Sequence, residues 1–170
     1  MTTQISPQSF RAFEIEVCHQ VRQLGWHVQS IGMQTYDNTT KTFLGRTENA
    51  TRHEPDFLAV HPSGAHCYLE VKGTTNRHRH SSNFTIECWS LMGCLLKDFV
   101  APSFIVWHDL TTSEPLDVYK SNPSVGPRSF VGSGDDYYLV SRSAIGLTSI
   151  PLHRRLELVR RTYGSKGGAR

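Results

Sequence analysis

Three charged residues, Asp56, Glu70 and Lys72, have the types and the spacing to do chemistry together. Glu70 and Lys72 are two residues apart in an apolar segment, so in a β-strand both side chains point to the same face. Carboxylate oxygens are the ligands that Mg²⁺ prefers, and a neighbouring lysine can position the water that attacks a phosphate. The pattern therefore predicts metal-dependent hydrolysis of a phosphodiester bond.

The segments that carry these charges have the pattern of a β-hairpin. Residues 55–60 (PDFLAV) predict a first strand, residues 61–65 (HPSGA) a turn, and residues 66–72 (HCYLEVK) the returning strand. Pairing across this turn places Asp56 opposite Glu70 or the next residue, at roughly 4.5–5.5 Å between antiparallel partners. Gathering the charges on one face of an apolar hairpin costs desolvation, which a divalent cation would offset.

Glu14 is the fourth candidate of this site. Residues 7–24 predict an amphipathic helix whose buried stripe includes Val17 and Val21. At about 100° per residue, Glu14 lies in line with that stripe and Glu16 lies towards solvent. An acid on the core-facing side of a helix is uncommon unless it is paired or binds a metal. Glu14 is therefore expected to assist as an additional metal ligand.

The rest of the chain predicts an α/β domain. An extended segment begins at residue 26, and the remaining elements are expected as follows: a polar loop over 33–53, a helix over 84–98 with Trp89 in the core, a buried strand over 103–107 with Trp107, loops over 109–136, a strand over 137–141, and a last helix from residue 150. This order indicates a central mixed sheet flanked by helices. We expect one domain over residues 1–163, and a disordered basic tail over 164–170.

The composition is that of an ordinary soluble domain, with 170 residues, 38% hydrophobic and 19% charged. A net charge of +3 permits a polyanionic partner without requiring one. The sequence has no apolar run near the ~20 residues of a membrane span and no signal-like start, which favours the cytoplasm and no membrane partner. The four cysteines are scattered, as is typical of reduced, buried thiols.

Pro55-Asp56 followed by Glu70-Val71-Lys72 resembles the signature of the PD-(D/E)XK nuclease superfamily, which has the restriction-endonuclease-like fold. The resemblance implies an α/β fold with a central mixed sheet between helices, and dependence on Mg²⁺ or Mn²⁺. It also implies that Asp56 and Glu70 bind the metal together with the Val71 carbonyl. Lys72 would then be the catalytic lysine.

The resemblance covers roughly residues 7–107, and one part of it departs from a known branch. Residues 87–91 (ECWSL) in the expected downstream helix differ from the Gln-x-x-x-Tyr pattern of RecB-like exonucleases. This difference favours an endonuclease. Glu87 itself fits two roles equally well, a polar helper of the site or an exposed helical acid.

Basic residues next to the motif are expected to contact DNA phosphates. They are Arg52, just before the first strand, and the loop residues Arg77, His78, Arg79 and His80, which directly follow the motif. The alternative for this loop is a solvated surface without a role. Four arginines of the last helix, Arg154, Arg155, Arg160 and Arg161, are expected to form an ordinary solvated face.

These observations predict a metal-dependent endonuclease that hydrolyses DNA phosphodiester bonds. A homodimer is compatible with this activity, because one small active site cuts one strand and duplex cleavage needs two. Two alternatives stay open. One is a structure-selective junction resolvase of the same fold, and the other is a catalytically silent nucleic-acid-binding subunit of a defence or mobile-element complex.

Overall fold

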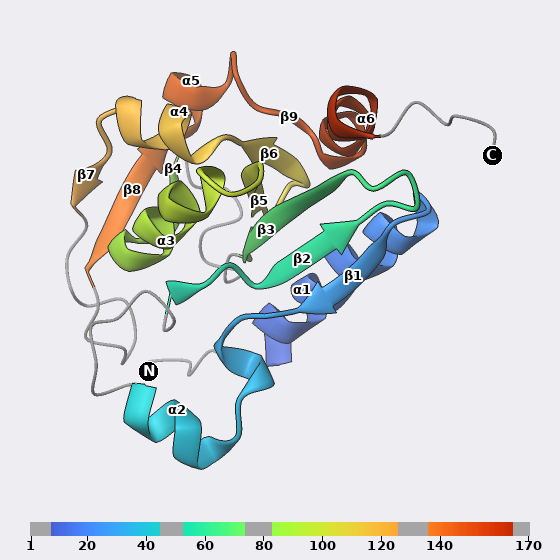
Figure 1. Ribbon diagram of the computed structural model, residues 1–170. Coiled ribbons are helices and arrows are strands. Elements are labelled where there is room, and N and C mark those ends of the chain that lie inside the picture. The colour runs from blue at the N-terminus through green and yellow to red at the C-terminus, as the bar shows by residue number, and fades with distance from the viewer. Residues whose placement is uncertain (1–7, 45–52, 74–82, 126–135, 165–170) are drawn as a thin grey trace, which may run out of the picture.

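A six-stranded mixed sheet is the central element of the computed structural model, which describes residues 8–44, 53–73, 83–125 and 136–164 (Figure 1). Its strands, in spatial order, are β1 (His27–Ser30), β2 (Phe57–Val60), β3 (His66–Lys72), β5 (Ser103–Trp107), β6 (Thr111–Ser113) and β9 (Ile150–Pro151). The β3–β5 pair is parallel, and the other pairs of this sheet are antiparallel. A second, antiparallel sheet has the order β4 (Asn83–Glu87), β8 (Tyr137–Ser141) and β7 (Ser124–Val125).

Helices pack on both sides of the central sheet. They are α1 (Gln8–Gln23), α2 (Asn38–Leu44), α3 (Cys88–Asp98), α4 (Pro115–Lys120), α5 (Arg142–Ile145) and α6 (Leu152–Tyr163), with a 3₁₀ helix η1 at Met33–Thr35. Buried side chains of α1 and α6 pack on one face of the sheet, and those of α3, α4 and the second sheet pack on the other. The expected mixed sheet between helices is confirmed. Among the described helices, none combines the length and the apolar character needed to cross a membrane.

The alternation of β3 divides its side chains between these two layers. Leu69 and Val71 are buried in the core formed with α1 and α6. Glu70 and Lys72 are the parallel partners of Ile105 and Trp107, which belong to the opposite core. Because parallel partners share a face, the two charged side chains point towards α3 and the second sheet.

The predicted hairpin is confirmed. Phe57 pairs with Leu69, and the His61 N–H donates to the Ala65 carbonyl at 2.8 Å to close the turn. Gly64 has φ +87°, a conformation that costs glycine little because it has no Cβ. The helix expected over 7–24 is also confirmed, as α1.

The helix expected over residues 84–98 is wrong in its first four residues, which belong to β4. Phe84 and Ile86 are buried while the residues between and beside them are half-exposed, which is the period of a strand. Pairing with β8 supplies the partners that this short segment lacks by itself. Only from Cys88 does the chain become helical.

Two segments expected as loops contain regular structure. Residues 33–53 include η1 and α2, and residues 109–136 include β6, α4 and β7. Pro115 stands in the first turn of α4, where its missing N–H leaves no helical hydrogen bond unmade. These elements are short, so the sequence periodicity that would predict them spans too few residues.

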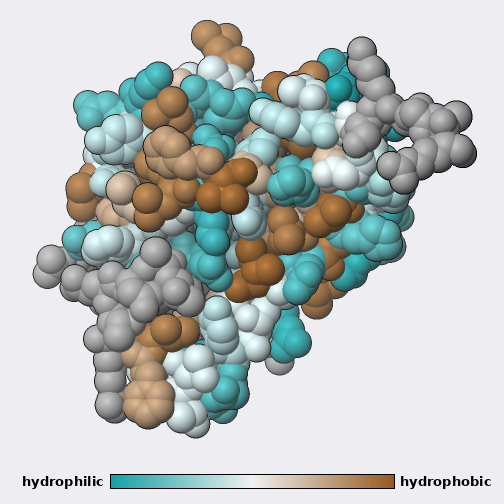
Figure 2. Space-filling view, in the orientation of Figure 1, coloured by the Kyte–Doolittle hydropathy of each residue, from teal (hydrophilic) through white to brown (hydrophobic). Residues whose placement is uncertain are grey.

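The expectations for single side chains were partly wrong. Trp107 is fully buried as predicted, but Trp89 is 44% exposed on α3, where Figure 2 shows hydrophobic side chains gathered at the surface. The cysteines are free thiols as predicted, although Cys88 is only half-buried. Arg155 is 8% exposed and not solvated, whereas Arg154 is exposed as expected.

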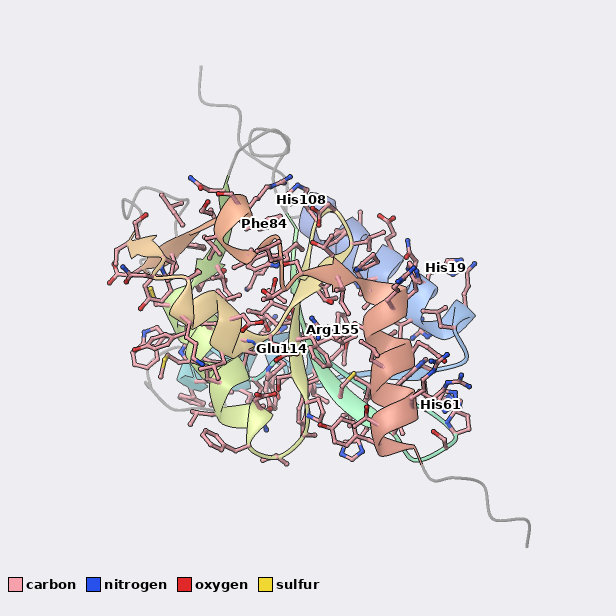
Figure 3. The ribbon with its side chains drawn as sticks, turned by 90° about the horizontal axis from the view of Figure 1, so that it is seen from above. His19, His61, Phe84, His108, Glu114 and Arg155 are labelled. Atoms are coloured by element: carbon pink, nitrogen blue, oxygen red, sulfur yellow. The ribbon has the colours of Figure 1, made fainter. Side chains whose placement is uncertain are left out.

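Burial of Arg155 is compensated by hydrogen bonds from its guanidinium to three acceptors. It donates to Glu114 Oε1 at 2.8 Å, to Thr112 Oγ1 at 3.2 Å and to the Thr148 carbonyl at 3.2 Å (Figure 3). It also lies 4.9 Å from the centre of the Phe104 ring. The hydrogen bonds join α6 to the edge of the central sheet.

Arg155→Ala is expected to lower the free energy of unfolding by about 3 kcal/mol, because it removes these hydrogen bonds and the packing on Phe104 together. Chemical denaturation measures the loss. The matched control is Arg154→Ala on the exposed side of the same turn, for which we expect a change within about 0.5 kcal/mol. Equal effects of the two substitutions would contradict a structural role for Arg155.

Candidate active site

The predicted site lies where β2 begins, beside the last residues of β3. Phe57 and Leu69 are the last paired residues of the two strands, so by continuation of the register Asp56 stands opposite Glu70. Here a side chain of the neighbouring strand segment accepts the hydrogen bond from β3. Asp56 Oδ2 accepts the Val71 N–H at 2.8 Å. The structure thus brings Asp56 beside the segment that carries Glu70 and Lys72.

Lys72 is the cation at the centre of this group. Its Nζ lies 2.6 Å from Glu70 Oε1 and 2.5 Å from Glu87 Oε2, and it donates to Ser90 Oγ at 3.3 Å. The side chains of Lys72 and Glu70 are 15% and 5% exposed. We call Asp56, Glu70 and Lys72 the charged site.

Glu87 is the contact that the sequence left undecided between two roles. It ends β4 and precedes α3, which turns its carboxylate towards Lys72. Tyr137 OH donates to Glu87 Oε1 at 3.2 Å, and Ser90 Oγ lies 3.4 Å from Oε2. The signal for this placement was the alternation of polar and apolar residues over 83–87, which is typical of a strand. At the end of a strand the Glu87 side chain points in a different direction from the one it would take in the first turn of a helix.

Glu14 approaches from α1, in the opposite layer. It is half-buried, in line with the fully buried Val17 and Val21, while Glu16 is exposed. Burial raises the pKa of the Glu14 carboxyl, and the charges of Lys72 and Glu70 act on it with opposite signs. The charges of Lys72 and Glu70 thus reach Glu14, and its role as an additional metal ligand stays a prediction.

The carboxyls of the charged site disfavour each other's ionisation. Burial raises the pKa of Asp56 to about 6, against the lowering effect of Lys72. Burial, followed by the charge of Asp56, raises the pKa of Glu70 to about 8. Glu87 behaves differently. Burial acts to raise the pKa of its carboxyl, but the charge of Lys72 and hydrogen bonds, including those from Lys72 and Tyr137, together lower it.

Lys72 stays charged in this environment. Burial opposes its charge, but Glu70, Glu87 and Asp56 together raise the pKa of its ammonium well above the usual value. One ammonium balances one carboxylate, so with Glu87 ionised, each further ionisation at Asp56 or Glu70 adds uncompensated negative charge.

This donor set fits a hard divalent cation. Carboxylate oxygens that repel each other in a buried place are stabilised by such an ion, and they are the donors that Mg²⁺ takes. In the part of the chain that the structure describes, no cluster of three or more His, Cys, Asp or Glu groups is already arranged around a position for a metal. Lys72 instead supplies the positive charge between the acids.

The residues expected to contact DNA lie outside the described ranges. They are Arg52, Arg77, His78, Arg79 and His80. Their described neighbours do flank the charged site: His53 and Glu54 lead to Asp56, and Gly73 follows Lys72.

No protein-family model matches this chain, and no curated protein matches its sequence. Among solved structures it is similar to Hjc, a Holliday junction resolvase from the archaeal hyperthermophile Archaeoglobus fulgidus. The TM-score is 0.51 at 11% sequence identity, over 87% of this chain and 98% of that chain. The fold is restriction-endonuclease-like. Within this fold, the expected α/β architecture and the mixed sheet are both confirmed.

Proposed function

We propose that this chain is a metal-dependent endonuclease of the PD-(D/E)XK superfamily, which hydrolyses DNA phosphodiester bonds. The observation that carries the proposal is the meeting of Asp56, Glu70 and Lys72 where β2 begins, with the Val71 N–H bound to Asp56. The likeness of the fold to a solved resolvase supports the same class of enzyme.

In this proposal Asp56, Glu70 and the Val71 carbonyl hold Mg²⁺ or Mn²⁺, and Glu14 assists directly or through water. When bound, the cation stabilises negative charge on the phosphate and makes a water molecule more acidic. The hydrogen bond from Val71 to Asp56 fixes that carboxylate against β3, so its position is set by the backbone. Such fixing lowers the cost of organising the site when substrate binds.

Lys72 would act as a fixed positive charge. Neighbouring carboxylates raise the pKa of its ammonium well above the usual value, so Lys72 carries its charge among these acids. Its Nζ can donate hydrogen bonds to the attacking water or to a phosphate oxygen. Orientation and charge stabilisation are therefore the roles that we assign to it.

Branched DNA is the substrate that we place first among the structure-selective candidates. The specific reason is that the solved structure of similar fold is a Holliday junction resolvase. A homodimer would bring two such sites to the two strands that resolution has to cut. The mild positive charge of +3 is compatible with a polyanionic substrate.

The proposal is tested by incubating the protein with supercoiled plasmid, linear duplex and a four-way junction, each with Mg²⁺, Mn²⁺ or EDTA. We expect strand cleavage with either metal and none with EDTA. Preferential cutting of the junction would identify a resolvase. Binding to DNA without cutting under every metal would overturn the enzyme and favour a silent binding subunit.

Glu87→Gln is expected to slow cleavage about tenfold, because a neutral amide no longer forms the ion pair that positions the Lys72 ammonium. Single-turnover rates measure the effect. Glu114→Gln is the control, since Glu114 is also paired with a cation, Arg155, but outside the charged site. A Glu87→Gln rate equal to that of the control would contradict a role for Glu87 beside Lys72.

A further inference from the structure

Two stacked rings, a half-buried His53 and an exposed Trp89, come from segments that flank the charged site. His53 and Trp89 have ring centroids 5.4 Å apart and planes inclined by only 18°. Trp89 is 44% exposed, whereas the other two tryptophans, Trp26 and Trp107, are 3% and 0% exposed. Although His53 stacks on it, Trp89 thus leaves part of a large aromatic side chain open to solvent.

Both residues of the pair are close in sequence to residues that form or contact the charged site. His53 is three residues before Asp56, and Trp89 is next to Ser90, whose hydroxyl contacts Lys72. A ligand that lies on this pair is therefore adjacent to the place where a phosphate would meet Lys72.

One face of α3 holds this arrangement rigid. Trp89, Gly93 and Lys97 follow each other at four-residue steps, so they lie along the same side of the helix. Lys97 Nζ is bound to Glu54 Oε1 at 2.9 Å. A Cβ at Gly93 would lie 1.9 Å from the His53 carbonyl oxygen, so glycine at this position allows the segment before Asp56 to lie directly on α3.

We propose that His53 and Trp89 form a stacking platform for an unpaired nucleobase of the DNA strand that enters the charged site. A nucleobase is the flat aromatic group that is always found within a nucleotide's length of a scissile phosphate, and stacking on aromatic side chains is a general way to hold one. In an intact duplex both faces of each base are covered by its neighbours. The platform therefore favours DNA with a gap, a flap or an open branch point.

This inference rests on the proposed function, because it takes the neighbouring site to bind a DNA strand. The test uses the fluorescence of the full chain in EDTA, so that DNA is not cut. Since the other two tryptophans are buried, quenching by iodide reports on Trp89. The probes are a duplex with a short single-stranded gap and the same duplex without the gap.

We expect gapped DNA to quench Trp89 and to protect it from iodide, while the intact duplex does neither. Trp89→Leu should weaken binding of the gapped DNA about tenfold, and Trp89→Phe, which keeps a ring, should restore most of it. Phe99→Leu is the matched control, because Phe99 is 90% exposed at the other end of α3 and should bind like the unchanged protein.

Binding of gapped DNA with Trp89 still open to iodide would overturn the platform and leave the proposed function standing. Equal affinities of Trp89→Leu and Phe99→Leu would do the same. Failure of the unchanged protein to bind any of these DNAs and to cut them with Mg²⁺ would instead overturn the proposed function, and the platform with it.

Discussion

Replacing Lys72 with alanine is expected to lower the rate of DNA cleavage by about 10³-fold while divalent-cation binding persists. The ammonium is the cation that lies among the acids of the charged site, at 2.6 Å from Glu70 and 2.5 Å from Glu87. Its removal takes away the positive charge that would face the phosphate in the transition state. The substitution leaves Asp56 in place, because the Val71 N–H holds that carboxylate.

Single-turnover cleavage with Mg²⁺ measures the first part, and thermal denaturation with and without Mg²⁺ measures the second. Lys97→Ala is the matched control, since Lys97 is also paired with a glutamate, Glu54, but does not contact the charged site. Cleavage by Lys72→Ala at the rate of Lys97→Ala would remove Lys72 from the mechanism. Loss of the Mg²⁺ effect in Lys72→Ala alone would show that Lys72 acts on the metal site as a whole.

The second large effect is the pH dependence of stability without metal. The pKa of Asp56 is raised to about 6 and that of Glu70 to about 8, above their usual values, mainly by burial. Between the unfolded and the folded pKa, the folded state binds more protons than the unfolded state, so stability falls as pH rises. We expect a loss of a few kcal/mol from about pH 4 to about pH 8.

Lys72 and the neighbouring Glu87 keep their charges over this pH range. The pKa of Glu87 is lowered and that of Lys72 is raised, so both stay charged between about pH 5 and about pH 8. Glu70→Gln should therefore flatten much of the decline and make the metal-free protein more stable than the unchanged chain at about pH 8. Mg²⁺ should stabilise the unchanged protein more at high pH, and Glu70→Gln hardly at all.

Urea denaturation across this pH range, in EDTA and in Mg²⁺, measures both effects. Glu157→Gln is the control, because Glu157 lies on the outer face of α6, paired with Arg160 and Arg161. Stability that rises from about pH 5 to about pH 8 without metal would contradict the charge repulsion on which the site is built.

The hairpin and the charged site were predictable because their determinants are local. A five-residue turn between two apolar segments sets the register, and the register alone places Asp56 in line with Glu70. The phase of one helix was enough to single out Glu14 from Glu16. The likeness of the fold to a solved resolvase supports the architecture that these signals indicated.

The residues that the sequence placed wrongly depend on contacts between distant segments. β4 is a strand because β8 pairs with it more than fifty residues later in the chain, and Glu87 reaches Lys72 for that reason. Arg155 is buried because Thr112, Glu114 and Thr148 meet around it. Trp89 is 44% exposed on α3, with the His53 ring of the segment before Asp56 stacked on it. None of these partners is visible in a helical or strand period.

Cleavage of a labelled four-way junction by excess protein, with Asp56→Ala beside the unchanged chain, tests the central claim most directly. Asp56 accepts the Val71 N–H and is the acid that joins the two strands of the hairpin at the site. We predict strand cleavage by the unchanged chain in Mg²⁺, none in EDTA, and loss of about 10³-fold in Asp56→Ala. Cleavage that persists in EDTA, or that is equal in Asp56→Ala, would contradict a metal-dependent nuclease centred on this site.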